Sequence, residues 1–275
     1  MKKVALCLHG YYNNRANINS GTEGFEYIRD TILSRTDFET DVFIHSWEPT
    51  RRQQLIELYS PKEIITENQV DFSIMMAKEG ITQEHFDEGF NRSQSKFAAC
   101  NIESTLSFLY SREKAINLST KGDYECVITA RFDLGQRDKQ QKRKYHVSTM
   151  NFDPNLDMNY FYSAMWDQLN AGYADQWFFS SQSNMIILKE AFTYAIDCFR
   201  ANSAYEASVT GGWFDSRKID NLSSTDPAQF TNEKLKCIKK GGKLMKYPRW
   251  QCVNNHLLYK WIIREMKLYE VSKFI

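Results

Sequence analysis

The chain has 275 residues, a formal net charge of +1 and 14% aromatic residues. This length suits one large α/β domain with a substantial core, and the aromatic content favours a globular protein over a disordered one. No segment approaches the roughly 20 apolar residues of a membrane span, and the apolar run of residues 4–8 is too short for a signal peptide. The six cysteines include no Cys-x-x-Cys pair, so we expect reduced thiols in a cytoplasmic protein and no zinc site.

Charge is distributed unevenly along the chain. Up to Asp133 there are 15 Lys and Arg against 20 Asp and Glu, and after it there are 20 against 14. The basic excess lies in two clusters, within residues 137–144 and 234–249. Such clusters are either solvated faces or the contact surface for a polyanion. Tyr247 and Trp250 beside the second cluster would suit a polyanion whose bases stack.

The first part of the chain alternates between apolar runs and helical patterns. Strands are predicted at residues 3–8, 41–47 and 62–67, with a helix at residues 51–58. Another helix should begin at Ser20, which forms a capping box with Glu23. The order βαβαβ with short connections predicts parallel strands. Residues 68–89 are expected to be loop with one helical piece.

Polar residues follow the first two predicted strands. The first strand leads into a loop with one glycine, Gly10, which matches neither the dinucleotide-binding nor the P-loop fingerprint. His45 near the end of the second strand is either an ordinary core histidine or a neighbour of a bound base or ribose. A long helix should begin near Ser93, and its amino end is either a plain cap or a place for phosphate.

The segment of residues 124–134, YECVITARFDL, is the predicted central strand. An apolar run that ends in charge suits a strand covered on both faces. Because side chains alternate, Thr129, Arg131 and Asp133 should share one face. The carboxyl end of a central strand is where open α/β sheets bind ligands. Arg131 and Asp133 are therefore either part of a binding site or an ordinary ion pair that closes the strand.

The pattern changes after residue 134. Short aromatic strands are predicted at residues 145–149, 159–164 and 176–180, then helices at about 183–199 and 252–268. We therefore predict an α/β fold in a single domain, residues 1–275. Its mostly parallel, Rossmann-like sheet should be flanked by helices and carry appended mixed or antiparallel strands.

The order of these segments resembles the GT-A fold of glycosyltransferases that use nucleotide sugars. The likeness is to small glycosyltransferases encoded beside surface-polysaccharide genes in bacteria and in large viruses and phages. Six segments carry it: KVALCLHGYYNNR, DVFIHSW, LYSPKEIITE, SQSKF, YECVITARFDL and ADQWFFSSQSNM. The resemblance implies that residues 1–134 bind the nucleotide sugar and that the basic residues 135–275 bind the acceptor.

Enzymes that this chain resembles commonly neutralise the departing diphosphate with Mg²⁺ or Mn²⁺, held by an Asp-x-Asp motif at the end of a central strand. Asp133 matches the last position of that motif, but Arg131 stands at the first, and a guanidinium cannot ligate a metal. Two alternatives remain open. Either Asp133 binds the ion with one further ligand, for which His256 is the candidate, or Arg131 itself neutralises the diphosphate. Otherwise His256 simply caps or packs the last helix.

The resemblance also assigns the remaining site residues. Asp175 is the candidate general base for the acceptor hydroxyl, and its structural alternative is to cap the turn into a strand. If Asp175 is the base, transfer inverts the anomeric carbon; otherwise retention is expected. Gly10, Arg15, Trp47 and Ser95 would line the nucleotide side together with the arginine of the altered motif.

Three hypotheses about function follow. The first is a glycosyltransferase that moves a hexose or pentose to a hydroxyl group, either of a surface glycan or of a hydroxymethylated base in phage DNA. Tyr247, Trp250 and Arg143 would contact the acceptor, and an aromatic ring could stack in place of an extruded base. The second is a nucleotide- or sugar-binding module without chemistry, supported by the altered motif. The third, a nucleic-acid-binding protein without catalysis, requires both basic clusters on one face, away from any pocket.

Overall fold

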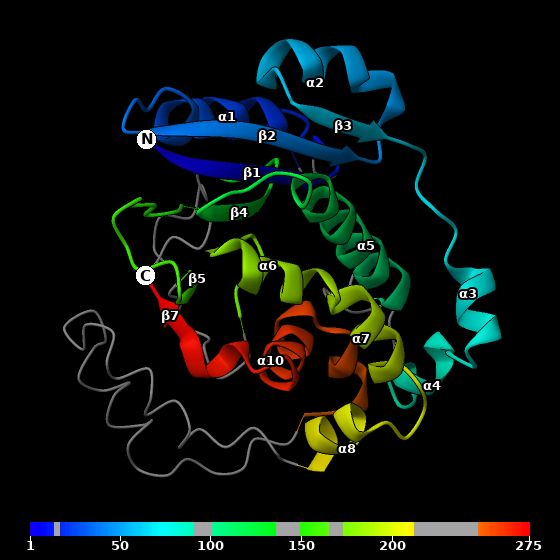
Figure 1. Ribbon diagram of the computed structural model, residues 1–275. Coiled ribbons are helices and arrows are strands. Elements are labelled where there is room, and N and C mark those ends of the chain that lie inside the picture. The colour runs from blue at the N-terminus through cyan, green and yellow to red at the C-terminus, as the bar shows by residue number, and fades with distance from the viewer. Residues whose placement is uncertain (14–16, 91–100, 136–148, 165–172, 212–246) are drawn as a thin grey trace.

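The computed structural model describes residues 1–13, 17–90, 101–135, 149–164, 173–211 and 247–275 (Figure 1). Within these ranges seven strands form one mixed sheet, in the order β3-β2-β1-β4-β6-β5-β7. The strands are β1 (Lys2–Gly10), β2 (Phe38–Ser46), β3 (Glu63–Thr66), β4 (Cys126–Arg131), β5 (Phe161–Ser163), β6 (Trp177–Ser180) and β7 (Ser272–Phe274). The protein is therefore α/β with a Rossmann-like sheet flanked by helices, as the sequence predicts.

The first four strands run parallel to one another. β1 pairs with β2 on one side and with β4 on the other, so that His9 lies between His45 and Arg131. Residues 4–9 of β1 are all buried, because helices cover both faces of a central parallel strand. Their continuous apolar character is what makes this strand, and likewise β4, recognisable in the sequence.

The other three strands form the mixed part of the sheet. β6 pairs antiparallel with both β4 and β5, and β7 pairs parallel with β5. The prediction of appended mixed or antiparallel strands is thus confirmed for β5 and β6. Figure 1 shows β5 below the parallel strands. The sequence did not indicate β7, since three residues at the end of the chain form no recognisable alternation.

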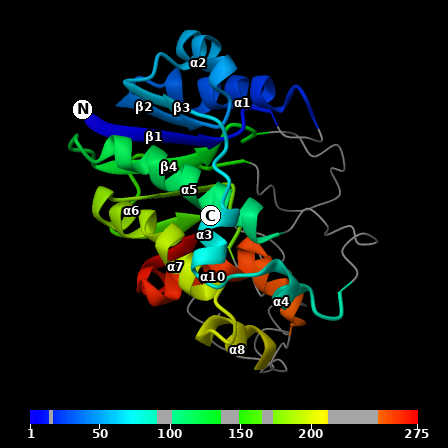
Figure 2. The same ribbon diagram turned by 90° about the vertical axis from the view of Figure 1, so that its right-hand side faces the viewer.

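Helices pack on both faces of the sheet. Their bounds are α1 (Ser20–Ile28), α2 (Arg52–Tyr59), α3 (Ser73–Lys78), α4 (Gln83–Asp87), α5 (Ile102–Ser119), α6 (Gln182–Lys189), α7 (Ala191–Cys198), α8 (Ala204–Gly211) and α10 (Asn255–Glu265). The long helix α5 lies against β1, β2 and β4, and both views place it beside β4 and α6 (Figure 2). Among the described residues, none of the helices has the length and apolar character to cross a bilayer.

Several local expectations need correction. Ser20 and Glu23 do not form a capping box, because Asn19 is the residue before the helix and no side chain caps it. The helix predicted at residues 183–199 is two helices, because the backbone of Glu190 (ψ 0°) departs from helical geometry between them. The last helix starts at Asn255, where Asn254 caps it, and not at residue 252. The strand predicted at residues 145–149 lies almost wholly outside the described residues.

Glycine at position 24 allows α1 to approach the end of β4. A Cβ atom on Gly24 would lie 1.8 Å from the carbonyl oxygen of Phe132, inside any permitted contact. We expect Gly24→Ala to lower the free energy of unfolding by about 3 kcal/mol, since backbone atoms must move apart. Urea denaturation measures this loss. Gly211→Ala is the matched control, because a Cβ there meets no atom within 4 Å. Equal stability of the two variants would contradict the prediction.

Candidate functional site

The strand order reverses at β1, so the carboxyl ends of β1 and β4 form the switch point of the sheet. The chain passes from β1 outward to β2 and β3, and returns with β4 on the other side of β1. In open α/β sheets this switch point is where ligands bind. Because β6 is antiparallel to β4, its amino end lies at the same edge, and the residues just before Trp177 join the site.

Arg131 and Asp133 form a two-bond ion pair at the end of β4. The Nε and Nη2 atoms of Arg131 donate to the two carboxylate oxygens of Asp133 at 2.8 and 2.6 Å. The Arg131 side chain keeps 32% of its surface exposed, whereas that of Asp133 keeps 8%. Arg131 lies beside His9 in the register of β1 and β4, so its side chain starts on the face that α5 covers. The arginine is thus the accessible member of the pair.

Asp175 is a buried carboxylate at the same edge. One of its carboxylate oxygens accepts a hydrogen bond from the Asn255 side-chain amide at 3.2 Å. Burial by itself would raise its pKa, but the nearby charges of His256, Arg131 and Arg112, with the Asn255 bond, bring the pKa below the ordinary value. Asp175 therefore remains ionised at neutral pH although the residue is only 7% exposed.

The start of α10 brings Asn255 and His256 to this carboxylate. Asn255 is held in place because its side-chain oxygen accepts a hydrogen bond from the Thr105 hydroxyl of α5 at 2.7 Å. His256 Nδ1 lies 2.7 Å from the carbonyl oxygen of Tyr173, and its own carbonyl accepts from the Tyr173 amide. Helix α10 thereby fixes the chain immediately before Asp175. These contacts agree with the packing alternative for His256, and the charge of this residue also lowers the pKa of Asp175.

Arg112, in the middle of α5, is a site residue that the sequence reasoning missed. Its guanidinium donates to His9 Nε2 at 3.1 Å, to the Tyr259 hydroxyl at 2.5 Å and to the carbonyl oxygen of Asp175 at 2.5 Å. The residue is 1% exposed. Burial lowers its pKa, but the starting value of an arginine is so high that the group stays charged. A charged residue on the buried stripe of a helix was the signal available in the sequence.

The carboxylate that was predicted to bind a divalent cation is occupied by an arginine. Both oxygens of Asp133 accept hydrogen bonds from Arg131, which competes with a metal for them. In the part of the chain that the structure describes, no three His, Cys, Asp or Glu residues form a group that could hold a metal ion. The Asp133 carboxylate is thus engaged by a guanidinium, whereas Mg²⁺ in phosphate-binding sites is usually held by one or two carboxylates together with substrate phosphates.

The predicted nucleotide side is described only in part. Gly10 ends β1 with a φ of 100°, and a Cβ at this position would meet no atom within 4 Å, so the backbone is open to a ligand. Trp47 is buried, and its ring stacks on Tyr110 of α5 at a centroid distance of 5.5 Å. One face of the indole is therefore already covered. Arg15 and Ser95 lie outside the described residues.

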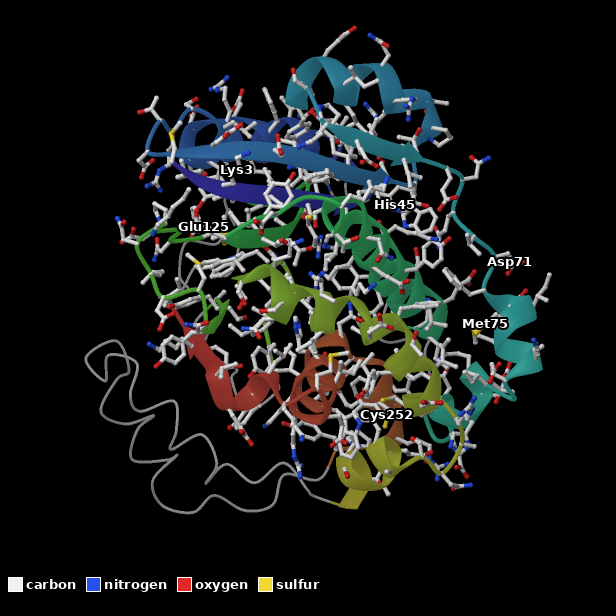
Figure 3. All side chains as sticks on the ribbon, in the orientation of Figure 1. Lys3, His45, Asp71, Met75, Glu125 and Cys252 are labelled. Atoms are coloured by element: carbon white, nitrogen blue, oxygen red, sulfur yellow. The ribbon has the colours of Figure 1, made fainter. Side chains whose placement is uncertain are left out.

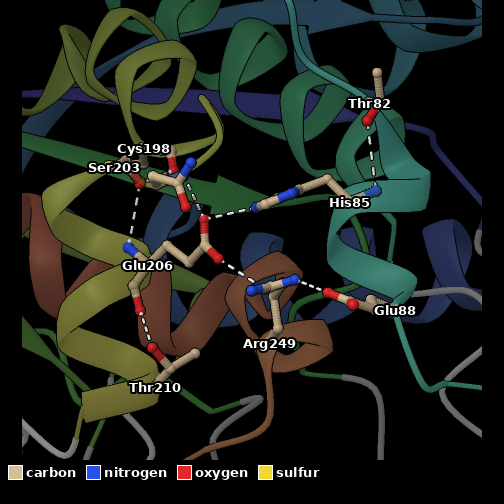
Figure 4. A network of polar contacts seen from close by, with 9 residues as sticks. Thr82, His85, Glu88, Cys198, Ser203, Glu206, Thr210 and Arg249 are labelled. Atoms are coloured by element: carbon tan, nitrogen blue, oxygen red, sulfur yellow. Dashed lines mark hydrogen bonds and ion pairs between the residues drawn. The ribbon is translucent and has the colours of Figure 1, made fainter.

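A second polar network fixes the region that carries the predicted acceptor residues (Figure 4). The buried carboxylate of Glu206 on α8 contacts His85 Nε2 at 2.8 Å and Arg249 Nε at 2.7 Å. It also accepts from the main-chain amide of Asn202 at 2.8 Å. Arg249 forms a second ion pair with Glu88. These bonds join α4, α8 and the segment Arg249–Val253, and they satisfy the buried charge structurally.

The acceptor residues themselves lie next to this network. Tyr247 donates its main-chain amide to the carbonyl oxygen of Val209 at 3.0 Å. The Trp250 ring stacks on Phe90 at a centroid distance of 4.4 Å, and it remains partly exposed. Arg143 and most of both basic clusters lie outside the described residues. The described contacts of Tyr247 and Trp250 are thus with Val209 and Phe90, beside the Glu206 network.

A cavity of about 330 Å³ lies at the opposite, amino edge of the sheet. Its lining includes Lys2 and Val4 at the start of β1, and Glu125 and Cys126 at the start of β4. Figure 3 shows Glu125 and Lys3 at one end of the strands and His45 at the other. The cavity is therefore distant from the Arg131, Asp133 and Asp175 cluster, and it does not enter the chemistry of that site.

His9 makes the stability of the site depend on pH. Burial, followed by repulsion from Arg112 and Arg131, holds its pKa well below 6.5. The unfolded chain binds a proton at this position as the pH falls through about 6.5, and the folded chain does not. The free energy of unfolding should therefore fall on acidification, by about 1.4 kcal/mol per pH unit from this residue.

We expect His9→Gln to reduce this slope, because glutamine can still accept from Arg112 but cannot be protonated. Urea denaturation of both proteins between about pH 7.5 and pH 5.5 measures the difference. The buried His45, whose pKa is also lowered by burial, remains in both proteins and keeps part of the slope. Identical slopes would show that His9 titrates normally in the folded protein.

Comparison of the chain with protein-family models, curated proteins and solved structures found no match.

Proposed function

We propose that the protein is a glycosyltransferase of the GT-A fold, which moves a sugar from a nucleoside-diphosphate sugar to a hydroxyl acceptor. The observation that carries this proposal is the meeting of Arg131, Asp133 and Asp175 at the switch point of the sheet. Sugar transfer needs a carboxylate to receive the acceptor proton and a positive charge to stabilise the diphosphate that departs. The site contains both, because Arg131 ends β4 and Asp175 lies just before β6 at the same edge.

Asp175 has the properties of a general base. It is ionised, and rigid partners from α5 and α10 hold its side chain and its backbone. In the proposed step it takes the proton of the acceptor hydroxyl while the oxygen attacks the anomeric carbon. The bond from that carbon to the diphosphate oxygen breaks, and its electron pair leaves with the diphosphate. Attack with such a base opposite the leaving group inverts the anomeric carbon.

Arg131 is the group that we propose for the diphosphate. A guanidinium binds phosphate with the same paired geometry that it uses for a carboxylate. Arg131 shows that geometry toward Asp133 and remains partly exposed. Asp133 would then orient Arg131 toward the donor. The contact of Arg131 with both oxygens of Asp133 supports this alternative over a metal ion, because it engages the carboxylate that would otherwise bind the ion.

The decisive experiment is a donor screen. The purified protein is incubated with uridine, guanosine and cytidine diphosphate sugars, and released nucleoside diphosphate is measured by chromatography. Release from one donor, accelerated by a glycan or by hydroxymethylated DNA, supports the proposal and identifies the acceptor class. Activity on DNA should fall steeply with salt, because phosphate contacts release counterions. No release from any donor, with or without acceptors, would count against an active transferase.

A nucleotide- or sugar-binding module without chemistry is the second candidate. The tight pairing of Asp133 with Arg131 favours it, because it occupies the carboxylate that would otherwise hold a metal. Calorimetry with the three nucleoside diphosphates, with and without Mn²⁺, separates the two functions when combined with the donor screen. Binding of one diphosphate without turnover of its sugar derivatives would favour the module.

A further inference from the structure

Arg112 joins three parts of the fold beneath the candidate site. It extends from α5 to His9 on β1, to Tyr259 on α10 and to the main chain of Asp175 before β6. All three acceptors are uncharged groups: a ring nitrogen, a phenol oxygen and a peptide carbonyl. The contact to Asp175 is made to the backbone, so Arg112 fixes the position from which that carboxylate extends.

The surroundings of this guanidinium are aromatic. Its central carbon lies 4.6 Å from the ring centroid of Phe108, 4.8 Å from that of Phe178 and 5.0 Å from that of Tyr259. The faces of these rings attract the cation, but they do not neutralise it. Among the ion pairs of the described residues, no carboxylate is a partner of Arg112. The nearest compensating charge is the Asp175 carboxylate, which is close enough to raise the pKa of Arg112.

Burial of such a charge is expensive for stability alone. A buried ion without a directly bonded counterion costs several kcal/mol of solvation, and a large apolar side chain would fill a space lined by three rings more favourably. The arginine also forces His9 to remain neutral beside it. The cation therefore lowers stability at a point where the proposed reaction places negative charge.

We propose that Arg112 is the buried cationic positioning residue of this active site. Its hydrogen bond to the Asp175 carbonyl sets the placement of the proposed base. Its fixed charge stabilises the negative charge that the site gathers, first on the Asp175 carboxylate and then on the departing diphosphate. The inference rests on the proposed function. It adds to the active site a residue that contacts neither the sugar donor nor the acceptor. Asp175 is faced by Arg112 from α5, Arg131 from β4, and His256 and Tyr259 from α10.

The test is chemical rescue of Arg112→Ala. This substitution should leave a space between the three rings that accepts free guanidinium, and urea has the same planar shape without the charge. We expect kcat to fall about a hundredfold, with a smaller change in the donor KM, because the base is misplaced. About 10 mM guanidinium, far below denaturing concentrations, should restore about tenfold or more of the rate, and urea should not. Equal rescue by urea, or rescue by neither, would overturn the proposal.

Further variants test the proposal if Arg112→Ala does not fold. Tyr259→Phe removes one acceptor but keeps the cation, so its kcat should fall less than about tenfold, whereas Arg112→Met should lose about a hundredfold. Lys114→Ala, which removes a cation over Tyr110 on the same helix, is the matched control and should keep the wild-type rate. Equal losses for Tyr259→Phe and Arg112→Met would assign the effect to packing and overturn the proposal.

The proposed function can fail independently of this inference. If the wild-type protein turns over no donor, the glycosyltransferase proposal fails, and the melting temperature of Arg112→Ala becomes the readout. An increase in this melting temperature with guanidinium, but not with urea, would support a cation site beneath the candidate site. Equal shifts with the two compounds would overturn it.

Discussion

Replacing Asp175 with asparagine is expected to reduce the rate of sugar transfer by about 10² to 10⁴-fold, the usual contribution of a general base. Asparagine keeps the shape of the side chain, so the Asn255 contact and the bond from Arg112 to the main chain can persist. What is lost is the charged oxygen that receives the acceptor proton. Donor binding should change little, because the proposed base faces the acceptor hydroxyl and not the diphosphate.

An acceptor that needs no base separates this role from a structural one. Azide is already anionic, so it can attack the anomeric carbon without losing a proton. With Asp175→Ala we expect azide to restore turnover and to yield a glycosyl azide of inverted configuration, which NMR identifies. Donor turnover in Asp175→Asn that equals wild type would remove Asp175 from the mechanism. Loss of turnover together with collapse of the melting temperature, and no response to azide, would make the carboxylate structural.

The sheet could be predicted from the sequence because its central strands are buried on both faces. β1, β2 and β4 appear as continuous apolar runs, and the observed strands differ from the predicted ones by a few residues at each end. The three-residue strand β7 leaves no such trace. Its place beside β5 depends on the packing of α10 and the last residues, which the sequence pattern does not encode.

Contacts within one segment of the site could be predicted from the sequence, but contacts between distant segments could not. Arg131 and Asp133 were predicted to be neighbours because they alternate on one strand, and the ion pair confirms that contact. Arg112 could not be placed in this way. Its partners are 103, 147 and 63 residues away in the sequence, so its role appears only when β1, α10 and β6 are assembled. Trp47 was predicted to line the nucleotide side, and in the structure Tyr110 of α5 covers one face of its ring.

Two positive and two negative side chains meet at the candidate site, which suits a reaction in which negative charge moves from the base to the departing diphosphate. Arg112 and Arg131 carry positive charge, and Asp133 and Asp175 carry negative charge. Arg131 can contact the donor diphosphate while Asp133 holds it, because it is the partly exposed member of its pair. Arg112 cannot move, because rings and acceptors surround it. Arg131 is thus suited to contact the diphosphate directly, and Arg112 is suited to stabilise negative charge from a fixed position.

Asp133→Asn is the second substitution from which we expect a large effect on transfer, with little effect on stability. The carboxylate holds Arg131 through both of its oxygens, and an amide can accept only one of these two bonds. Arg131 would then lose its orientation, and we expect a loss of about a hundredfold or more in kcat/KM. The melting temperature should change little, because the freed guanidinium is partly exposed and such pairs contribute about 1 kcal/mol or less.

A double-mutant cycle decides whether the pair acts as one unit. If Asp133 acts only by orienting Arg131, then Arg131→Gln should cost at least as much, and the double variant should be no worse than Arg131→Gln alone. Chelation of divalent ions should leave the wild-type rate unchanged, since the arginine supplies the positive charge. Independent losses that multiply in the double variant, together with a rate that EDTA abolishes, would mean that Asp133 binds a metal and that the other alternative for the altered motif is correct.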